Sequence, residues 1–394
     1  MSSDFTAIVS GAGPAGLAAA ILLAQDGVNT AVIAPGIADD ARTTALMQPA
    51  VQLLKFVGVW TGELQAQCAP LKRLHILDDV GNLIAAPPIE FTADELGLAE
   101  FGFNVPLAAL IPALHVRAKA CGVHFIIGSS LRAQLHDANI QVELADGAVF
   151  TSRVLLVADG AKSTLRASLG FKTEERHFAQ MALATSFSHT AQHEFTSTEW
   201  HKPDGAFTTV PLPGNRSSLV WMGKPARVEG LLAMDDRTLA TEIQLGTHGT
   251  LGRISDLGPR KAFAMTSQRA TCFAKQRAIL IGEAAHSLPP IGAQGLNLSL
   301  RDAATAADLI IGAQDPGAES ICATYDKQRR SDVIPRQEMT GLLNLSLLSG
   351  FEGAHIVRAV GLAAVAKIPT LRQLAMRQGL YPSAPLPFAM RANT

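Results

Sequence analysis

The chain has 394 residues, enough for two or three domains of roughly 150 residues each and for a large buried core. Hydrophobic residues make up 48% of the chain and charged residues 17%, a composition outside the range of disordered proteins. With 33 basic and 34 acidic side chains, the formal net charge is −1. No general positive field is therefore present to attract a polyphosphate, and we expect no nucleic-acid partner.

Two further features bear on the cellular compartment. The four cysteines lie far apart and form no CxxC pair, which fits a reducing compartment and predicts a cytoplasmic protein. Residues 5–25 carry no charge, but Gly11, Gly13, Pro14 and Gly16 interrupt this stretch and no basic segment precedes it. We therefore expect neither a cleaved signal peptide nor a membrane-spanning helix.

The N-terminal residues predict a nucleotide-binding turn. Residues 6–10 form a short β-branched run, residues 17–24 have helical spacing of apolar side chains, and residues 29–34 supply a second strand. The turn between the first strand and the helix contains Gly11, Gly13, Ala15 and Gly16. In this strand–turn–helix–strand context, the GxGxxG spacing predicts that a pyrophosphate binds at the helix N-terminus.

One element of that nucleotide motif is missing. The acidic residue expected at the end of the second strand, where it would hold ribose hydroxyls, is replaced by Ala34. Asp39 and Asp40 are the nearby candidates to substitute for it, or nothing does.

Two later segments repeat the pattern of a strand followed by a polar loop and a helix. In the first, residues 154–157 form an apolar strand that leads into Asp159 and Gly160. In the second, residues 278–281 form a strand that leads into Gly282 and Glu283, and a proline-rich loop over residues 289–292 follows. An ordinary strand-to-helix connection would also explain the first segment. The second segment is a more specific sequence pattern and is less easily explained in that way.

These three motifs, in this order, resemble those of the class A flavin-dependent aromatic hydroxylases, which are single-component FAD monooxygenases. Residues 40–60 resemble the branch of that family that hydroxylates polyprenyl phenols in ubiquinone biosynthesis. The resemblance covers nearly the whole chain, through residues 211–213 and on to residues 325–332.

The resemblance implies roles for individual residues. Arg42 would touch the FAD diphosphate, Asp159 would help to hold the FAD-binding architecture, and Glu283 would bind the ribityl chain. Glu283 stands where the family usually has Asp, while Val157 and Ser299 replace glycines that are common in the pattern.

The flavin ring needs backbone N–H donors where negative charge develops on reduction. Gly295, Leu296 and Asn297 are placed to provide these donors, and Pro290 lies in a stiff loop over the ring. Apolar residues at helical spacing follow and predict that a helix begins at this motif, with its positive end directed at the flavin. Core packing alone would explain the same apolar stripe.

The expected fold class is α/β. A Rossmann-like FAD-binding domain with a mainly parallel sheet is interrupted by an antiparallel-sheet substrate domain and followed by a helical C-terminal part. We place the FAD-binding domain at residues 1–73, 98–171 and 271–334, the substrate domain at residues 74–97 and 172–270, and the C-terminal region at residues 335–394.

Histidines contribute no expected metal site. His189 and His193 have a spacing that binds metals on a helix, but they lie among polar residues in a predicted strand or loop. We interpret both as exposed, solvated side chains. His286 is the histidine inside a motif, where a role in positioning the loop is as plausible as a catalytic one.

The C-terminal segment from residue 351 is both basic and apolar. Its basic residues are Arg358, Lys367, Arg372, Arg377 and Arg391, against a single acidic Glu352. Such a segment predicts either an amphipathic helix on the inner face of an anionic membrane or a helix docked on the FAD domain.

The function implied by the resemblance is FAD-dependent hydroxylation of a polyprenyl phenol by O2 through a C4a-hydroperoxyflavin. No second GxGxxG follows, so NAD(P)H or a separate reductase would meet the flavin transiently, and other proteins of ubiquinone biosynthesis are candidate partners. Two alternatives stay open: a hydroxylase of a soluble aromatic acid, and a flavin-free accessory or lipid-presenting subunit. A buried arginine placed for a carboxylate would favour the first alternative.

Overall fold

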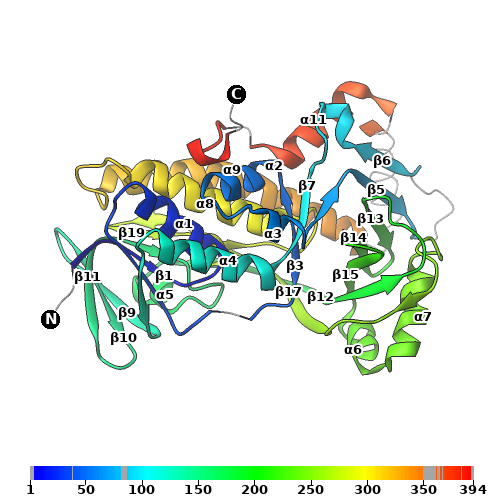
Figure 1. The fold of residues 1–394 in the computed structure, drawn as a ribbon, viewed down its shortest axis with the longest axis horizontal. Coiled ribbons are helices and arrows are strands. Elements are labelled where there is room, and N and C mark those ends of the chain that lie inside the picture. Colours follow the sequence, from blue (N-terminus) through cyan, green and yellow to red (C-terminus); the bar gives the residue numbers. More distant parts are fainter. Residues whose placement is uncertain are drawn as a thin grey trace.

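A computed structural model describes residues 4–37, 39–80, 87–348, 361, 364–365, 367–382 and 384–391. The chain forms two lobes, one around a mainly parallel sheet and the other around a nine-stranded sheet (Figure 1). Helix α9 (Glu319–Leu348) extends along both lobes and contacts strands of each. The α/β fold class predicted from the sequence is confirmed.

The first lobe contains an eight-stranded sheet in the order β18-β19-β11-β1-β2-β8, with β10 and β9 paired beside β11. Strands β1, β2, β8, β11 and β19 run parallel to one another, whereas β10 pairs with β11 and β18 pairs with β19 in the antiparallel direction. The central residues of these five parallel strands are apolar and belong to the core of this lobe or pack against it. The strands are β1 (Asp4–Ser10), β2 (Thr30–Ala34), β8 (His124–Ile127), β9 (Ser130–Leu135), β10 (Ile140–Leu144), β11 (Val149–Val157), β18 (Ala274–Lys275) and β19 (Ala278–Leu280).

Helices of this lobe pack on its sheet and on each other, and α1 contacts both α4 and α8. Leu17 and Ile21 of α1 are completely buried, as the helical spacing in the sequence predicts. The helices are α1 (Pro14–Gln25), α2 (Gln48–Phe56), α3 (Gly62–Gln65), α4 (Leu107–Ala120), α5 (Thr164–Ser168), α8 (Gln294–Ile310) and the short η2 (Gly282–Ala284) and η3 (Phe388–Met390).

The second lobe contains the sheet β20-β17-β12-β15-β14-β13-β5-β6, with β16 beside β12. Its pairs are antiparallel, except that β5, from an earlier part of the chain, joins β13 in parallel. The elements are β5 (Arg73–Asp78), β6 (Ile89–Thr92), η1 (Ala93–Leu96), β12 (Thr173–His189), β13 (Thr196–Lys202), β14 (Gly205–Leu212), β15 (Arg216–Gly223), α6 (Pro225–Ala233), α7 (Asp236–Gly246), β16 (Ile254–Ser255), β17 (Lys261–Ala270) and β20 (His286–Ser287).

The two faces of this second sheet have different partners. One face carries Phe187, Trp200 and Phe207, which pack with Val228 of α6 and Ile243 of α7. The opposite face carries Ala182, Ala206 and Met222, which pack with Ile291, part of the proline-rich loop of the first lobe. The second face is therefore turned toward the predicted flavin region.

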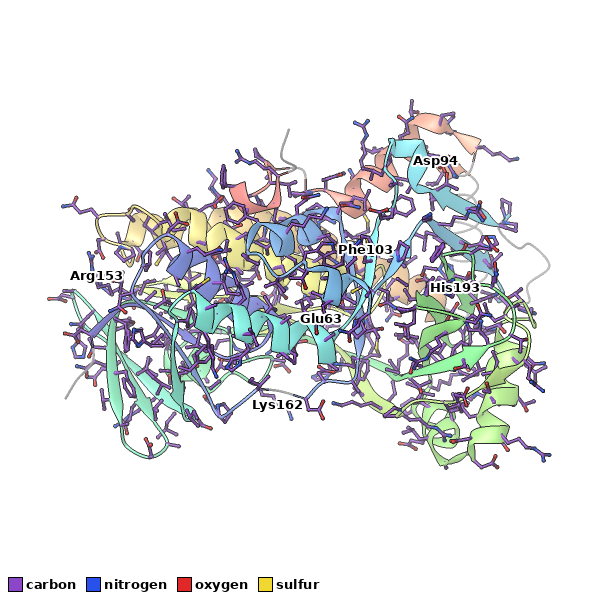
Figure 2. The ribbon with its side chains drawn as sticks, viewed as in Figure 1. Glu63, Asp94, Phe103, Arg153, Lys162 and His193 are labelled. Atoms are coloured by element: carbon purple, nitrogen blue, oxygen red, sulfur yellow. The ribbon has the colours of Figure 1, made fainter. Side chains whose placement is uncertain are left out.

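A small antiparallel sheet, β3-β7-β4, connects the lobes. It comprises β3 (Thr43–Met47), β4 (Ala69–Leu71) and β7 (Gly102–Pro106). From β7, the buried Asn104 donates hydrogen bonds to the Pro211 carbonyl and the Ser218 hydroxyl of the second sheet. Phe103 lies where the lobes meet, with its ring centroid 4.9 Å from that of Trp60 (Figure 2).

The C-terminal helix α11 (Pro369–Leu380) docks on the second lobe. Met376 and Leu380 are buried against Phe91 and Phe101, and Arg372 pairs with Glu95. The sequence left open a membrane-bound helix or one docked on the FAD domain, and the structure shows docking, but chiefly on β6 and η1 of the other lobe. Arg358 and Glu352 lie outside the described residues, and no described helix is long and apolar enough to cross a membrane.

The domain boundaries stay a prediction. Strands β5 and β6 belong to the second sheet, as expected for residues 74–97, while α9 runs through the expected start of the C-terminal region at residue 335.

Candidate flavin site

The glycine-rich turn between β1 and α1 is shaped by two close backbone approaches. A Cβ on Gly11 would stand 2.2 Å from the Ala158 carbonyl oxygen, and a Cβ on Gly16 would stand 2.2 Å from the Gly11 carbonyl oxygen. A Cβ on Gly13, in contrast, would meet nothing within 4 Å. The first and third glycines are thus required for packing, while the second leaves open space in front of the helix.

The N-terminus of α1 is open to an anion. Gly13 is the N-cap residue, and no described side chain caps this end of the helix. The N–H groups of Ala15 and Gly16 belong to the first turn, where intrahelical acceptors are lacking and the helix dipole favours negative charge. This end of α1 can therefore bind a pyrophosphate through backbone donors alone.

A second helix N-terminus lies at the third motif. Helix α8 begins at Gln294, next to Ala293 in the left-handed conformation (φ 53°), and no described side chain caps it. By helix geometry, the N–H groups of Gln294, Gly295 and Leu296 have no acceptor within the helix. A Cβ on Gly295 would also meet nothing within 4 Å, so this end of α8 is open as well.

Asn297 anchors this helix to the small sheet that connects the lobes. Its side chain is buried, accepts a hydrogen bond from the Met47 N–H at 2.8 Å and donates one to the Ala45 carbonyl at 2.8 Å. As the fourth helical residue, it has its backbone N–H directed at the Ala293 carbonyl in regular helix geometry. The predicted role of its N–H toward a flavin stays a prediction; its side chain positions the helix.

The loop before α8 separates the two lobes. Pro290 is exposed, whereas the neighbouring Ile291 is only 3% exposed and packs on the second sheet. A planar ring bound beside Pro290 and the start of α8 would therefore have the open face of the second sheet on its far side.

Asp159 follows β11, beside the glycine-rich turn. Its Oδ2 accepts a long 3.4 Å hydrogen bond from the Leu165 N–H, and its buried Oδ1 has no partner within the described parts of the chain. Burial raises the pKa of this carboxyl above its ordinary value. An unpaired buried acceptor at this position fits a hydroxyl donor such as a ribose.

Arg42 and Glu283 lie close enough to interact electrostatically. The Arg42 side chain is 44% exposed and pairs with Asp40 at 2.6 Å, while Glu283 is exposed. Asp40, one of the two candidates to replace the missing ribose ligand, is thus engaged by Arg42 in this structure, while Asp39 is exposed.

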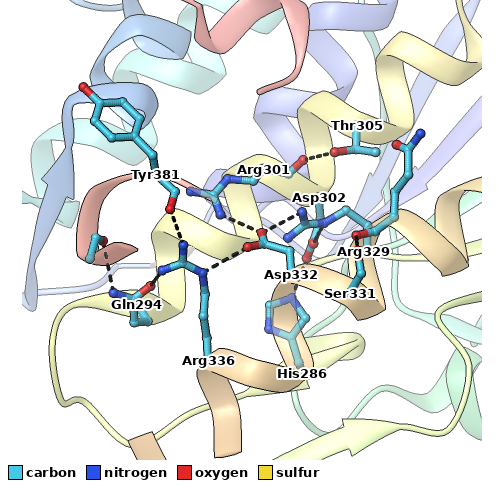
Figure 3. Close-up of polar contacts among 12 residues, drawn as sticks. His286, Gln294, Arg301, Asp302, Thr305, Arg329, Ser331, Asp332, Arg336 and Tyr381 are labelled. Carbon is cyan, nitrogen blue, oxygen red and sulfur yellow. Dashed lines mark hydrogen bonds and ion pairs between the residues drawn. The ribbon is translucent and has the colours of Figure 1, made fainter. Parts of the chain in front are cut away.

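A buried ion network supports the third motif (Figure 3). Asp302, with no exposed side-chain area, accepts hydrogen bonds from the Gly282 N–H (2.9 Å), His286 Nε2 (2.7 Å) and Arg329 Nε (2.6 Å). Burial alone would raise the pKa of Asp302, but His286 and Arg329 outweigh it and hold that pKa below its ordinary value. The contact of His286 with Asp302 joins the His286 loop to α8.

The network continues to the start of α8. Asp332 bonds Arg301, Arg329 and Arg336, and Arg336 donates to the Gln294 side chain at 3.0 Å and to the Tyr381 carbonyl at 2.7 Å (Figure 3). These contacts join α9 and the end of α11 to the first residue of α8. Sequence reasoning missed them as site residues, although the helical spacing of Arg329, Asp332 and Arg336 is a signal that one face of α9 is charged.

The prediction that His189 and His193 are both exposed and solvated was wrong, since His189 is buried and His193 is half-buried. His189 is 5% exposed, not solvated, with Nε2 3.0 Å from the Ser217 hydroxyl and Nδ1 2.7 Å from the Ala191 carbonyl. The alternation of strand β12 turns it inward, and burial lowers its pKa. His193 lies on the second lobe (Figure 2), and its Nε2 contacts backbone carbonyls of Leu212 and Gly214. Within the described residues, no group of three or more potential metal ligands occurs.

The two open helix N-termini and the unpaired Asp159 oxygen are suited to binding a dinucleotide. Residues 4–336 match the family described as FAD binding domain. The chain belongs to this family, and FAD is its cofactor, as the sequence predicts.

Similar proteins extend over nearly the whole chain. It is 28% identical over 388 residues to a protein of Rhodospirillum rubrum named ubiquinone hydroxylase UbiL, covering 95% of this chain and 89% of that one. It is also 28% identical over 389 residues to the 3-demethoxyubiquinol 3-hydroxylase of Escherichia coli, covering 94% of this chain and 97% of the relative.

Solved structures share the fold. The crystal structure of p-nitrophenol 4-monooxygenase PnpA from Pseudomonas putida matches with a TM-score of 0.78 at 16% identity, covering 98% of this chain and 100% of that chain. At this identity the likeness concerns the fold alone.

Proposed function

We propose that the protein is an FAD-dependent monooxygenase that hydroxylates the aromatic ring of a polyprenyl phenol in ubiquinone biosynthesis. The observation that carries this proposal is the position of the open N-terminus of α8, between the FAD-binding lobe and the mostly apolar inner face of the second sheet. The relatives named for ubiquinone hydroxylation support the choice of substrate class.

Different residues would bind the cofactor and shield the reaction from water. Backbone N–H groups of Ala15 and Gly16 would hold the pyrophosphate, and those of Gly295 and Leu296 would stabilise negative charge on the reduced ring. Pro290 and Ile291 would exclude water from the reacting atoms. Bound FAD supplies the activation of O2 and the transfer of one oxygen atom, with electrons from NAD(P)H or a separate reductase.

The alternative substrate, a soluble aromatic acid, lacks its distinguishing feature in the described structure. The arginines buried there are Arg166, Arg301 and Arg329, and all three donate to acceptors of the first lobe or α9. All three lie on helices α5, α8 and α9, and none of them lies on a strand of the second sheet.

We further propose that the protein contacts the inner face of the membrane, where a polyprenyl phenol resides. Ile368, Leu371 and Leu374 of the α11 region are 44%, 41% and 51% exposed, and the exposed Lys367 and Arg377 lie beside them. An apolar stripe with flanking basic side chains fits an anionic lipid surface. Other proteins of ubiquinone biosynthesis are candidate partners there.

The test starts from the visible absorption spectrum of the purified protein, which should show bound oxidised flavin. The holoprotein is then supplied with a chemical reductant, isotopically labelled O2 and either a prenylated phenol or 4-hydroxybenzoate. A prenylated product carrying one labelled oxygen atom would support the proposal. Labelling of 4-hydroxybenzoate instead would favour the soluble-acid alternative, and a colourless protein that takes up no FAD would favour the accessory subunit.

A further inference from the structure

A polar pair lies on the inner face of the second sheet, and none of the motifs includes it. Glu199 and His201 stand two residues apart on β13, with Glu199 Oε1 2.9 Å from His201 Nε2. Their side chains are 11% and 2% exposed. The Thr208 hydroxyl lies 3.4 Å from the other Glu199 oxygen.

Strand register places this pair on the face that is turned toward the flavin region. Trp200, between the two residues, packs with Phe207 on the face that is covered by α6 and α7. Successive side chains alternate between faces, so Glu199 and His201 point the opposite way. The cross-strand partner of His201 is Ala206, which belongs to the cluster that contains Ile291.

Apart from Thr208 and Asp78, the residues beside the pair on this face are small or apolar. Ala182, Ala206 and Met222 belong to that cluster, which also contacts Leu343 of α9. The charged residue beside His201 on the adjacent strand is Asp78, in register with it on β5, whereas Lys202 lies over the Phe207 ring on the opposite face. Burying an ionisable pair in such surroundings is unfavourable unless its polar atoms find partners.

One atom of the pair has no such partner. His201 Nδ1 is buried and bonds to no group in the described parts of the chain. Because an ionised carboxylate only accepts hydrogen bonds, Glu199 requires the proton on His201 Nε2, and the neutral ring then has its lone pair on Nδ1. The pair therefore presents a buried proton acceptor on the inner face.

We propose that His201 is the catalytic base that takes the proton of the phenol hydroxyl. Glu199 is the residue that positions the His201 ring and stabilises its protonated form. This inference rests on the proposed function. The phenol O–H bond breaks, its electron pair stays on oxygen, and the proton binds Nδ1; the imidazolium is stabilised by Glu199, and the proton returns to oxygen when the product leaves. A phenolate ring is more electron-rich, as oxygen transfer to its carbon requires.

The experiment measures ionisation of a bound phenol. The full-length holoprotein is titrated with a geranyl-substituted phenol over a range of pH, and the phenolate absorption is followed in difference spectra. In the wild-type protein, we expect the bound phenol to ionise below the value of about 10 that is usual for a free phenol. In His201→Gln, that pH should rise by at least one unit, about a tenfold loss of phenolate at fixed pH, and hydroxylation should slow about 100-fold.

Three controls separate this role from a structural one. His75→Gln changes a histidine that lies on the neighbouring strand β5 and points to the opposite face of the sheet. The phenol bound to this variant should ionise at the same pH as the phenol bound to the wild-type protein. Glu199→Gln keeps the shape of the pair but removes its charge and should give a smaller rise in the same direction. The methyl ether of the phenol, which has no proton to give, should bind the wild-type protein and His201→Gln equally well.

The outcomes are distinguishable. Ionisation of the bound phenol at the same pH in His201→Gln and the wild-type protein, with FAD retained by both, overturns the role of the pair while the proposed function stands. If His201→Gln loses FAD, the shift in Glu199→Gln decides the question in its place. No phenol-dependent spectrum in the wild-type holoprotein at any pH overturns the proposed function and this inference together.

Discussion

At the residue scale, the glycines of the first turn separate two requirements that the GxGxxG pattern combines. Gly11 and Gly16 allow backbone atoms to approach closely, whereas Gly13 leaves space that no part of the described chain uses. Substitution of Gly11 or Gly16 should therefore impair folding, whereas substitution of Gly13 should impair cofactor binding.

We expect Gly13→Val to abolish FAD retention while leaving the unfolding temperature of the apoprotein unchanged. The added side chain meets only the space in front of α1, so it blocks the pyrophosphate without disturbing the core. Loss of several charge-assisted hydrogen bonds should weaken FAD binding at least 100-fold, which fluorescence titration measures.

The matched control for this substitution is Gly16→Val. Its Cβ would collide with the Gly11 carbonyl, so the apoprotein itself should be destabilised, with a lowered unfolding temperature. Normal flavin occupancy in Gly13→Val would contradict the assigned pyrophosphate site.

Arg42→Ala should weaken FAD binding without reducing stability. The pair that Arg42 forms with Asp40 lies at the surface and is partly exposed, and such pairs contribute about 0–1 kcal/mol to the free energy of unfolding. If Arg42 contacts the diphosphate, the loss of affinity should shrink as salt is added to the titration. An affinity equal to that of the wild-type protein at low salt would remove Arg42 from the site.

At the element scale, Asp302 holds α8, α9 and the Gly282–His286 segment together from a completely buried position. Asp302→Asn would remove one of the two carboxylates that pair with Arg329 in the interior, and the other, Asp332, also pairs with Arg301 and Arg336. We expect the free energy of unfolding to fall by about 3–5 kcal/mol, because the buried positive charge of the network is then incompletely balanced.

Chemical denaturation of the apoprotein measures this loss. Asp308→Asn, on the exposed end of the same helix, is the control and should change the unfolding free energy by no more than about 0.5 kcal/mol. Equal stability of the two variants would show that the network contributes no more than a surface contact.

Docking of α11 should depend on acid pH through a single ion pair. The hydrogen bond from Arg372 lowers the pKa of Glu95 from 4.5 to about 2. A lowered pKa in the folded state means that the contribution to docking is complete above pH 4.5 and is lost as the pH falls toward 2.

Protection of residues 369–380 against hydrogen exchange, measured relative to the intrinsic exchange rate at each pH, should therefore fall in that pH window in the wild-type protein. In Glu95→Gln the exchange should already be faster at neutral pH and show a smaller change in the window. The same pH response in both proteins would exclude this ion pair as its cause.

The elements that the sequence predicts well are those whose signals are local. The strand, turn and helix around Gly13 and the start of α8 at Gln294 follow from short-range periodicity and glycine spacing. The ion network and the docking of α11 could not be predicted in this way, because Asp302 meets Arg329 and Glu95 meets Arg372 only after distant segments fold together. His189 was misjudged for the same reason, since its burial depends on which face of β12 is covered.

At the scale of the whole molecule, two lobes meet so that the flavin-binding lobe and the inner face of a separate sheet enclose one region. The polar pair of Glu199 and His201 could not be predicted from the sequence, because the sequence of a strand does not show which lobe each of its faces contacts. The packing of Ile291 on the second sheet places this face next to the loop of the third motif, which the sequence alone does not reveal.

The last prediction concerns the surface of the whole molecule. A double substitution of Leu371 and Leu374 by Glu should lower binding to anionic vesicles about tenfold or more, because it adds two charges to the exposed apolar stripe of α11. Met376 and Leu380 hold the opposite side of the helix in the core, so flavin content and unfolding temperature should not change.

Co-sedimentation with vesicles of mixed neutral and anionic lipid measures this binding. Leu245→Glu is the matched control, since Leu245 is 67% exposed on α7 of the same lobe, away from the basic side chains of the tail. If the double variant and the control bind vesicles as the wild-type protein does, α11 serves only to cover Phe91 and Phe101. A selective loss of binding in the double variant would instead mean that one side of α11 packs in the core and the other side contacts the membrane. Such contact would place the proposed active site close to a substrate in the lipid.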